Sequence, residues 1–362
     1  MALNKKIIIA TGGTGGHIFP SLSLADFLKN KFKIEIITDK RGLKFVENTD
    51  EINIKIISSD TIFKKNIMNI FYGVLKNIFS FINCLLLMIK ERPVMVIGMG
   101  GYSSFPTCIA AFCLRIPILI YENNLVLGRA NKFLLPFANK ILVSTENIQG
   151  IKEKFNNKIV RCGYLIRRNF LESVIEEKSN SSEDIFSILI MGGSQSAKIF
   201  GEIIPDIIVK LANKGNKLRI YQQCLDHQIS KIKKKYDKAK IEFELFPFSK
   251  DMYKFLKKTD LVISRSGASS LSELVNLRIP FIAIPLPSSI DNHQFENANY
   301  FKKKGYCLLL EERYLQNQLF EILIDLKNNQ NVLFLMKKKM REHSDKETCS
   351  KIQKLIESIL NV

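Results

Sequence analysis

Short runs of apolar, mostly β-branched residues alternate along the chain with longer stretches in which apolar positions recur every three or four residues. Near-continuous apolar runs are typical of parallel strands buried on both faces, and the periodic stretches predict the helices that cover them. Because such runs fill both halves of the chain, the pattern predicts two doubly wound α/β domains. The predicted strands are residues 7–10, 34–38, 52–57, 94–98, 116–121, 140–143, 159–161, 186–191, 218–222, 241–246, 261–264 and 281–285.

The boundary between the two predicted domains falls where the first series of strands ends. We place the domains at residues 1–164 and 165–341. A charged, serine-containing stretch at 172–184 predicts a surface loop before the first strand of the second domain. We expect the last segment, 342–362, to pack back on the first domain. Within it, four apolar residues predict an amphipathic helix: Ile352, Leu355, Ile356 and Ile359.

The composition narrows the class of protein. Of the 362 residues 46% are hydrophobic, which is enough for a core in each domain, and the formal net charge is +19. So basic a chain favours anionic partners, but composition alone does not choose among nucleic acid, phosphorylated substrates and an acidic membrane surface. Seven Cys without a Cys-x-x-Cys pair argue against a disulfide framework or a structural zinc site and fit a reducing compartment. The first apolar run is too short for a signal peptide.

Two glycine-rich loops carry the clearest chemical signal. Each follows the first strand of a predicted domain and opens a helix: Gly12-Gly13-Thr14-Gly15-Gly16-His17 and Gly192-Gly193-Ser194-Gln195-Ser196-Ala197. Glycines let backbone N–H groups approach a phosphate, and the start of a helix favours negative charge. Neither loop has the spacing Gly-x-Gly-x-x-Gly of dinucleotide sites or the Lys-Ser/Thr of nucleotide-hydrolysing loops. Tight turns without a ligand are the alternative interpretation.

A third glycine cluster follows the predicted strand at 94–98 and precedes another predicted helix. It reads Gly98-Met99-Gly100-Gly101-Tyr102-Ser103-Ser104. The cluster is a candidate site for a second phosphate-bearing substrate, because it has the same placement between strand and helix. A turn whose glycines serve only packing is the alternative.

The segment 66–89 is strongly apolar, yet polar or small residues interrupt it regularly: Asn66, Asn69, Gly73, Lys76, Ser80 and Asn83. This period suits an interfacial helix or a core helix better than a bilayer span. Several lysines could meet anionic headgroups along its apolar side: Lys64, Lys65, Lys76 and Lys90. Ordinary core packing stays open as the alternative.

The motifs together resemble the MurG family of peptidoglycan N-acetylglucosaminyltransferases, and the similarity runs over nearly the whole chain. Besides the glycine loops it rests on Arg265-Ser266-Gly267-Ala268 with Ser272-Glu273, and on Asp291-Asn292-His293-Gln294 with Asn297-Ala298. The resemblance implies a GT-B fold, in which two Rossmann-like domains, each with a doubly wound parallel sheet, face each other across a cleft. It assigns the acceptor and the membrane to the first domain and the UDP-sugar to the second.

The chain departs from the family pattern at three places. The family usually has His-Glu-Gln-Asn where this chain has Tyr121-Glu122-Asn123-Asn124. The second glycine loop usually reads GGSQGA, and here Ser196 replaces its last glycine. The family's Gly-Asn-Pro-Val-Arg becomes Gly163-Tyr164-Leu165-Ile166-Arg167, which keeps the arginine.

The implied reaction moves N-acetylglucosamine from UDP-N-acetylglucosamine to the C4 hydroxyl of the muramoyl sugar of undecaprenyl-diphosphate-N-acetylmuramoyl-pentapeptide. In-line attack inverts the anomeric carbon and needs a base for the acceptor hydroxyl and positive dipoles for the leaving diphosphate. His17 is the preferred catalytic base because histidine titrates near neutral pH, and Glu122 is the second candidate. Arg167 and helix dipoles are expected to neutralise the leaving group.

The resemblance also implies the residues that contact the substrates. Glu273 would accept hydrogen bonds from the ribose diol. The implied donor-binding set is Thr14, Gly15, Gly16, His17, Asn124, Arg167, Ser194, Gln195, Ser249, Gly267, Ala268, Glu273, His293, Gln294 and Asn297. The implied set for the acceptor diphosphate is Gly13, Thr14, Gly100, Gly101 and Tyr102.

No Asp-x-Asp pair stands at a strand end beside the loops, so we expect neither a metal nor another cofactor. The expected partners are UDP-N-acetylglucosamine, the undecaprenyl-linked acceptor, an anionic membrane surface and proteins of cell-wall synthesis, and not nucleic acid. The expected location is peripheral, at the cytoplasmic face of the bacterial inner membrane. Two alternatives stay open: a UDP-N-acetylglucosamine 2-epimerase, which needs extra carboxylates and no lipid surface, and a non-catalytic UDP-sugar-binding subunit.

Overall fold

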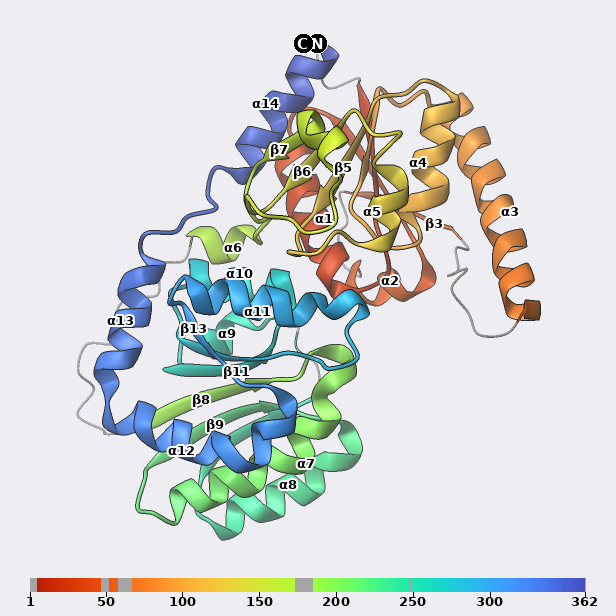
Figure 1. Ribbon diagram of the computed structural model, residues 1–362. Coiled ribbons are helices and arrows are strands. Elements are labelled where there is room, and N and C mark those ends of the chain that lie inside the picture. The colour runs from red at the N-terminus through yellow and green to blue at the C-terminus, as the bar shows by residue number, and fades with distance from the viewer. Residues whose placement is uncertain are drawn as a thin grey trace. The chain divides into compact units, whose positions relative to one another are not determined.

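The computed structural model describes residues 5–46, 52–57, 67–172, 185–247, 249 and 251–361, without the side chains of 44, 67–71 and 193–197. The chain forms two compact units, one made of Met1–Arg168 with Asp345–Val362 and the other of Asn169–Ser344. Each unit is built on a parallel sheet with helices packed against it (Figure 1).

The sheet of the first unit has seven parallel strands in the order β3-β2-β1-β4-β5-β6-β7. Their bounds are β1 Lys6–Ala10, β2 Lys33–Thr38, β3 Asn53–Ile56, β4 Met95–Gly98, β5 Ile118–Glu122, β6 Lys140–Val143 and β7 Ile159–Arg161. Strand β1 pairs with β2 on one side and β4 on the other, so the strand order reverses there. Doubly wound sheets bind ligands beyond the carboxyl ends of strands at such a reversal.

Helices cover both faces of this sheet. The first unit contains α1 Gly15–Leu28, α2 Lys40–Val46, α3 Ile67–Glu91, α4 Ser104–Cys113, α5 Arg129–Leu134, a 3-10 helix at Glu153–Lys158 and α14 Thr348–Leu360. Ile7 and Ile9 of β1 pack in one core with α1 and α14, whereas Ile8 packs in a second core with α3, α4 and α5. This split follows from the alternation of side chains along a strand.

The second unit repeats the plan with six parallel strands in the order β10-β9-β8-β11-β12-β13, which reverses between β8 and β11. The strands are β8 Phe186–Met191, β9 Leu218–Gln223, β10 Glu242–Phe246, β11 Leu261–Arg265, β12 Phe281–Ile284 and β13 Cys307–Leu309. The helices are α7 Gly193–Ala212, α8 Asp226–Lys238, α9 Tyr253–Leu256, α10 Ala268–Asn276, α11 His293–Lys303, α12 Leu315–Asn328 and α13 Gln330–Met340, with 3-10 turns at Ile290–Asn292 and Glu312–Tyr314. Helix α6 (Arg168–Glu172) lies at the division between the units.

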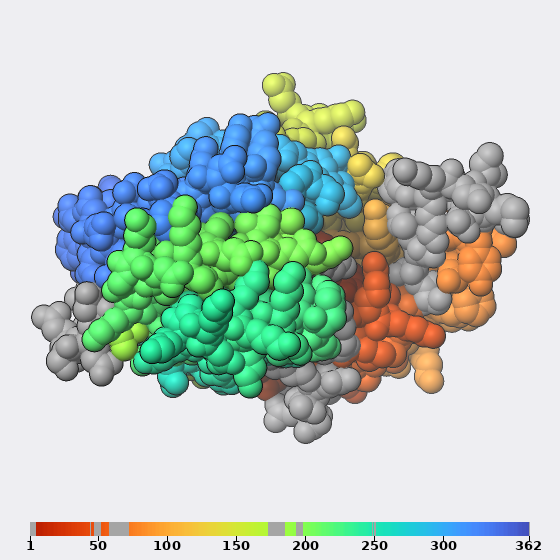
Figure 2. Space-filling model, turned by 90° about the horizontal axis from the view of Figure 1, so that it is seen from below, coloured from red at the N-terminus to blue at the C-terminus, as the bar shows by residue number. Residues whose placement is uncertain are grey.

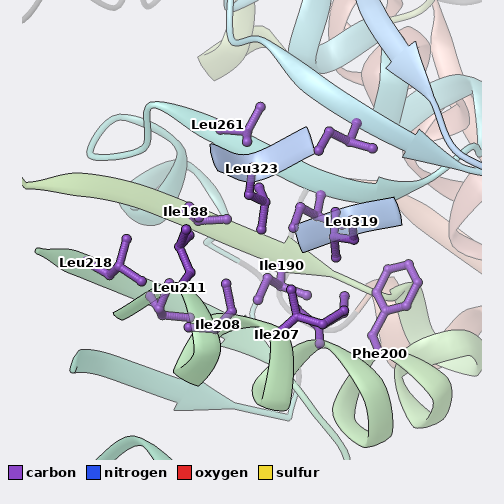
Figure 3. Close-up of a cluster of buried hydrophobic side chains, with 14 of the residues drawn as sticks. Ile188, Ile190, Phe200, Ile207, Ile208, Leu211, Leu218, Leu261, Leu319 and Leu323 are labelled. Atoms are coloured by element: carbon purple, nitrogen blue, oxygen red, sulfur yellow. The ribbon is translucent and has the colours of Figure 1, made fainter. Parts of the chain in front are cut away.

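One face of the second sheet packs against α7, α8 and α12. Ile188 and Ile190 of β8 share a fully apolar core with Leu211 of α7 and Leu319 of α12 (Figure 3). Figure 2 shows the outer sides of α7 and α8, coloured green and blue-green, as one continuous surface. On the other face, the ring of Phe281 in β12 packs edge-on against that of Phe301 in α11, with centroids 6.3 Å apart.

The predicted fold class is confirmed, and each predicted strand is present within a few residues of its expected bounds. Strand β13 was not predicted, because Cys307–Leu309 contains no β-branched residue, unlike the equally short run at 159–161. The amphipathic C-terminal helix is confirmed as α14, in which Ile352 and Ile356 are fully buried against the first unit. Apart from Glu172, the predicted surface loop at 172–184 lies outside the described residues.

Helix α3 matches the amphipathic segment predicted at 66–89. In the described part of the chain it is the one helix whose length and composition would let it cross a membrane, over Tyr72–Glu91 with a mean hydropathy of 1.6. Cys84 and Met88 are buried against the sheet, while Phe79 and Leu86 are about three-fifths exposed. The helix therefore packs on the domain by one side and presents apolar side chains outward. Lys64 and Lys65 lie outside the described residues.

Candidate active site

Two of the glycine loops pack backbone against backbone at the carboxyl ends of β1 and β4. The amide of Gly12 donates a hydrogen bond of 2.9 Å to the carbonyl oxygen of Gly100. A Cβ atom on Gly12 would lie 2.7 Å from the Cα of Gly101, and one on Gly101 would lie 2.5 Å from the Cα of Gly12. Gly101 also has a φ of +78°, which side chains disfavour. The two loops can approach this closely only because both positions are glycine.

Replacing Gly101 with alanine should lower the free energy of unfolding by roughly 2–4 kcal/mol, because a Cβ there meets backbone and the positive φ becomes strained. Gly16→Ala is the matched control, since a Cβ on Gly16 meets nothing within 4 Å. We expect that change to alter stability by less than about 1 kcal/mol. Urea unfolding followed by circular dichroism measures both, and equal losses in the two variants would contradict the backbone contact.

His17 lies beside the contact between these loops. It is the third residue of α1, is half-buried, and follows the exposed Thr14 at the helix start. Its ring packs on Gly100, where a Cβ would come within 2.9 Å of Cε1 and 3.0 Å of Nδ1. The structure thus gathers the sequence-predicted Gly13, Thr14, His17, Gly100 and Gly101 at one edge of the first sheet.

Glu122, the last residue of β5, is 2% exposed and holds the following loop in place. Its Oε1 accepts hydrogen bonds from the amide and the side-chain nitrogen of Asn124, at 3.1 and 2.9 Å. Its Oε2 accepts from the amide of Gly128 at 2.8 Å and from Nδ2 of Asn131 at 3.0 Å. The four donors occupy both oxygens of the carboxylate and tie it to the loop that follows β5.

Tyr121, which stands where the family usually has histidine, supports the segment that ends the first unit. Its buried hydroxyl donates to the carbonyl of Gly163 at 3.3 Å and accepts from the amide of Leu165 at 3.1 Å. Burial raises the pKa of this phenol well above its usual value. Asp345 accepts a 2.9 Å hydrogen bond from the amide of Tyr164 between them. Tyr121 and Asp345 thus both hold the backbone of residues 163–165, which ends two residues before Arg167.

Arg167 itself lies against the start of α1. Its guanidinium carbon is 4.9 Å from the centroid of the Phe19 ring, a cation–π contact that fixes the side chain. The same ring lies 3.2 Å from where a Cβ on Gly15 would be. The predicted arginine and the first glycine loop are therefore neighbours within one unit.

Asp39 is a residue that the sequence analysis missed. It follows β2, is 4% exposed, and accepts hydrogen bonds from the amide, Nε and Nη2 of Arg41 and, at 2.7 Å, from the hydroxyl of Ser103. Burial opposes its ionisation, but these donors outweigh that effect and hold the pKa of Asp39 below its usual value. Its Oδ1 would lie 2.1 Å from a Cβ on Gly13. Asp39 thereby joins both glycine loops to the end of β2. In the sequence, the one sign of this role was that Asp39 directly follows the strand predicted at 34–38.

In the second unit the loops after β11 and β12 are tied together by an amide side chain. The Oε1 of Gln294 accepts hydrogen bonds from the amides of Ser266 and Leu286, at 3.2 and 3.0 Å. Asn297 is fully buried and donates to the carbonyl of Ser266 at 3.1 Å. Both sequence-predicted residues thus shape the backbone that leads into α10.

Arg265 lies beneath this edge. Its guanidinium forms an ion pair with Glu312, donates to the carbonyls of Ile284 and Pro285, and has its carbon 4.6 Å from the centroid of the Phe200 ring. Burial lowers the pKa of Arg265, and the hydrogen bond and charge of Glu312 oppose that shift. The sequence motif that contains Arg265 therefore begins with a structural residue.

The remaining predicted donor residues lie near the same edge or have no described side chain. Gly267 caps α10 with open space where a Cβ would be, and Glu273 is half-buried in that helix. The Nδ1 of His293 lies 2.7 Å from the carbonyl oxygen of Ile290, at the start of α11. Ser249 is half-buried between β10 and α9. Ser194 and Gln195 are in the first turn of α7, and their side chains lie outside the described part.

Within the described residues, no three His, Cys, Asp or Glu side chains gather as a set of metal ligands.

Comparison with known families and proteins identifies the two units. Residues 7–143 match the model of the glycosyltransferase family 28 N-terminal domain, and residues 187–356 match that of the family 28 C-terminal domain. The chain belongs to glycosyltransferase family 28. Each matched range covers most of one of the two parallel sheets.

Relatives of nearly equal length carry the name that the motifs suggested. A protein of Pelagibacter ubique, named UDP-N-acetylglucosamine--N-acetylmuramyl-(pentapeptide) pyrophosphoryl-undecaprenol N-acetylglucosamine transferase, is 39% identical over 99% of both chains. A Rickettsia felis protein of the same name is 38% identical over 91% of this chain and 92% of its own. The resemblance to the MurG family is thus confirmed.

Solved structures agree on the fold. The crystal structure of MurG from Acinetobacter baumannii has a TM-score of 0.77 at 24% identity, covering 98% of this chain and 99% of that one. MnaA of S. aureus with UDP has a TM-score of 0.70 at 17% identity, covering 99% and 97% of the two chains. These structural similarities show that the chain has the GT-B fold.

Proposed function

We propose that this protein is the inverting N-acetylglucosaminyltransferase that converts undecaprenyl-diphosphate-N-acetylmuramoyl-pentapeptide to its N-acetylglucosaminyl form, using UDP-N-acetylglucosamine. The observation that carries the proposal is the sequence identity of 39% and 38%, over 99% and 91% of this chain, to relatives that are named for this reaction. The bond formed joins the anomeric carbon to the C4 oxygen of the muramoyl sugar, and the bond broken releases UDP. The reaction belongs to peptidoglycan synthesis.

A transfer assay tests this function directly. Purified protein should move labelled N-acetylglucosamine from UDP-N-acetylglucosamine to a lipid-linked muramoyl-pentapeptide acceptor and release UDP in equal amount. Epimerisation of the donor without transfer would support the 2-epimerase alternative. Donor binding without either reaction would support a non-catalytic subunit.

The first unit is proposed to hold the acceptor. The backbone of the loops at Gly13–Thr14 and Gly100–Tyr102, which meet at the strand-order reversal, supplies N–H groups for a diphosphate. We propose His17 as the base that takes the proton of the acceptor hydroxyl, because its ring lies beside these loops. Glu122, with its four donors, is proposed to order the loop that carries Asn124 rather than to act as the base.

The second unit is proposed to hold the donor at the edge formed by the loops after β8, β11 and β12. Gly267 caps α10, and a Cβ on it would meet nothing within 4 Å, which suits a close approach of ligand to the helix start. Glu273, in the second turn of that helix, is proposed to bind the ribose hydroxyls, and Gln294 and Asn297 to hold the loop around Ser266. The diphosphate would meet the first turn of α7, with Ser194 and Gln195.

Replacing Glu273 with alanine should weaken UDP binding by roughly 1–3 kcal/mol, the cost of losing hydrogen bonds to a charged acceptor. Titration calorimetry with UDP measures this. Glu296→Ala is a matched control. Glu296 is also a half-buried glutamate in a helix of the second unit, and we assign it no role in binding. Unchanged affinity in Glu273→Ala would remove this residue from the ribose site.

The protein is further proposed to act as a peripheral protein at the cytoplasmic face of the bacterial inner membrane. Support comes from the outward apolar side chains of α3, including Phe79 and Leu86, and from the formal net charge of +19. Apolar insertion and attraction to anionic lipid would act together. Proteins of cell-wall synthesis are proposed as further partners because the product is a cell-wall precursor.

A further inference from the structure

An arginine lies at the edge of the first glycine loop. Arg41 is the second residue of α2, a helix that lies beside α1 (Figure 1). The Cβ atom of Arg41 lies 2.6 Å from where a Cβ on Gly13 would be, so its backbone adjoins the loop that opens α1. Its side chain is 59% exposed. Arg41 therefore presents a positive charge to solvent beside a residue that we assign to the acceptor diphosphate.

A buried carboxylate sets the direction of this side chain. The Oδ2 of Asp39 accepts a hydrogen bond from Nη2 of Arg41 at 2.7 Å, and its Oδ1 accepts one from Nε at 3.2 Å. Such a two-point contact orients the plane of a guanidinium and restricts its rotamers. An arginine that is ordered in this way before binding loses less conformational entropy when it meets a ligand.

The same carboxylate reaches the other loop of the candidate diphosphate site. Its Oδ2 also accepts a 2.7 Å hydrogen bond from the hydroxyl of Ser103, in the glycine cluster at 98–104. Ser103 and the Nη2 of Arg41 are thus bound to one oxygen atom, which places the guanidinium close to both loops. The ring of His17 packs on Gly100. The candidate site therefore has a histidine at one loop and an arginine at the other.

Backbone amides alone leave the charge of a diphosphate largely uncompensated. An N–H group offers a partial charge, whereas a guanidinium offers a full positive charge and paired donors that match phosphate oxygens. The diphosphate of the acceptor keeps its charge during transfer, because the bond that breaks belongs to the donor. A contact to it should be equally strong in the ground state and in the transition state, so its loss should raise KM without changing kcat.

We propose that Arg41 binds the diphosphate of the acceptor beside the loops at Gly13 and Gly100, and that Asp39 is the positioning residue that orients Arg41. The proposal rests on the proposed function, which supplies an acceptor with a diphosphate. Arg41 is the cationic part of a site whose loops supply N–H groups. It thereby makes the site prefer a diphosphate to a monophosphate.

Steady-state kinetics with a soluble short-chain acceptor, in the absence of vesicles, test this contact. Arg41→Ala should raise the acceptor KM by at least about tenfold, through the loss of charge-assisted hydrogen bonds. The kcat and the KM for UDP-N-acetylglucosamine should stay within about twofold of the wild-type values. Arg41→Lys keeps the charge but not the paired donors, so its acceptor KM should lie between. Asp39→Asn should raise the acceptor KM by less than Arg41→Ala does.

Arg161→Ala is the matched control. Arg161 also belongs to the first unit, is 55% exposed and forms an ion pair with a glutamate, Glu146. It ends β7, the last strand of the sheet, whereas the two loops follow β1 and β4. The acceptor KM of this variant should equal that of wild type. Equal increases in Arg161→Ala and Arg41→Ala would mean that the overall charge of the unit attracts the acceptor, and would overturn the proposal.

Calorimetry separates a contact with phosphate from a disturbed loop. With the donor site saturated by UDP, wild type should bind geranyl diphosphate more tightly than geranyl monophosphate, and Arg41→Ala should reduce that preference by at least about fivefold. A disturbed loop would weaken the binding of both ligands alike, and an unchanged preference in Arg41→Ala would refute the contact. Arg41→Lys, which keeps a cation beside Asp39, decides the same point if Arg41→Ala does not fold.

Failure of the proposed function is distinguishable from failure of this contact. Absence of transfer by the wild-type protein would refute the proposed function. The calorimetric preference for geranyl diphosphate does not depend on transfer, so its loss or retention in Arg41→Ala would still decide whether Arg41 binds a diphosphate.

Discussion

Replacing His17 with alanine should lower kcat for transfer by about 10²–10⁴-fold, the usual contribution of a general base. The affinity for UDP should change little, because we place the nucleotide on the second unit. Since a histidine base must be deprotonated to act, the wild-type rate should fall at acidic pH, and that limb should disappear in the variant. A pH series of single-turnover rates together with UDP calorimetry measures all three quantities.

The matched comparison for His17 is Glu122→Gln, which keeps the shape of the side chain. Its carboxylate accepts four hydrogen bonds, two of them from backbone amides, so the glutamine should disturb the 123–128 loop and raise the acceptor KM. The acidic limb of the rate profile should survive in this variant. Glu122 rather than His17 would be the base if two results came together. His17→Ala would lower kcat by less than about tenfold and keep the acidic limb of the rate profile, whereas Glu122→Gln would lose that limb.

The fold was predictable because each strand is a short, nearly unbroken apolar run whose two faces both meet helices. Ile7, Ile8 and Ile9 show the reason: their side chains alternate between two cores, so each must be apolar. Strand β13 escaped because Cys307–Leu309 is apolar but has no β-branched residue, and it pairs only with β12, at the sheet edge. Its existence depends on the neighbouring strand, which a local pattern does not contain.

The sequence located the site's loops but not the contacts beneath them. Glycines at 12 and 101 could be read as phosphate-binding positions, yet their closest contacts are with each other. Asp39 and Ser103 are far apart in the chain and form a hydrogen bond because β2 and the loop after β4 end at the same sheet edge. Residues of this kind support the site without motif spacing, so they become visible only once strand order is known. The assignments of individual residues to donor and acceptor stay predictions.

Tyr121 illustrates the same limit at a position where the chain departs from its family. The sequence shows only that tyrosine stands here where the family usually has histidine. In the structure the hydroxyl of Tyr121 bridges the backbone at Gly163 and Leu165, shortly before the chain passes into the second unit. The departure is therefore accommodated by hydrogen bonds to the backbone, which do not depend on what side chains residues 163 and 165 carry.

Replacing Glu312 with alanine should lower the free energy of unfolding of the second unit by roughly 2–4 kcal/mol, because it leaves the buried guanidinium of Arg265 without its carboxylate. The melting temperature should fall by roughly 4–16 °C for a unit of this size. The guanidinium also donates to the carbonyls of Ile284 and Pro285, so its displacement should disturb the loop after β12 and weaken UDP binding.

Glu311→Ala is the matched control, one residue away. Glu311 pairs with Arg313, whose side chain is 68% exposed, and such surface pairs contribute no more than about 1 kcal/mol. Scanning calorimetry of the full chain should therefore show a large shift for Glu312→Ala and almost none for Glu311→Ala. Similar small shifts in both would mean that water solvates Arg265 once Glu312 is gone. In that case Gln294, through its hydrogen bonds to the amides of Ser266 and Leu286, would hold the loop after β12 without help from Arg265.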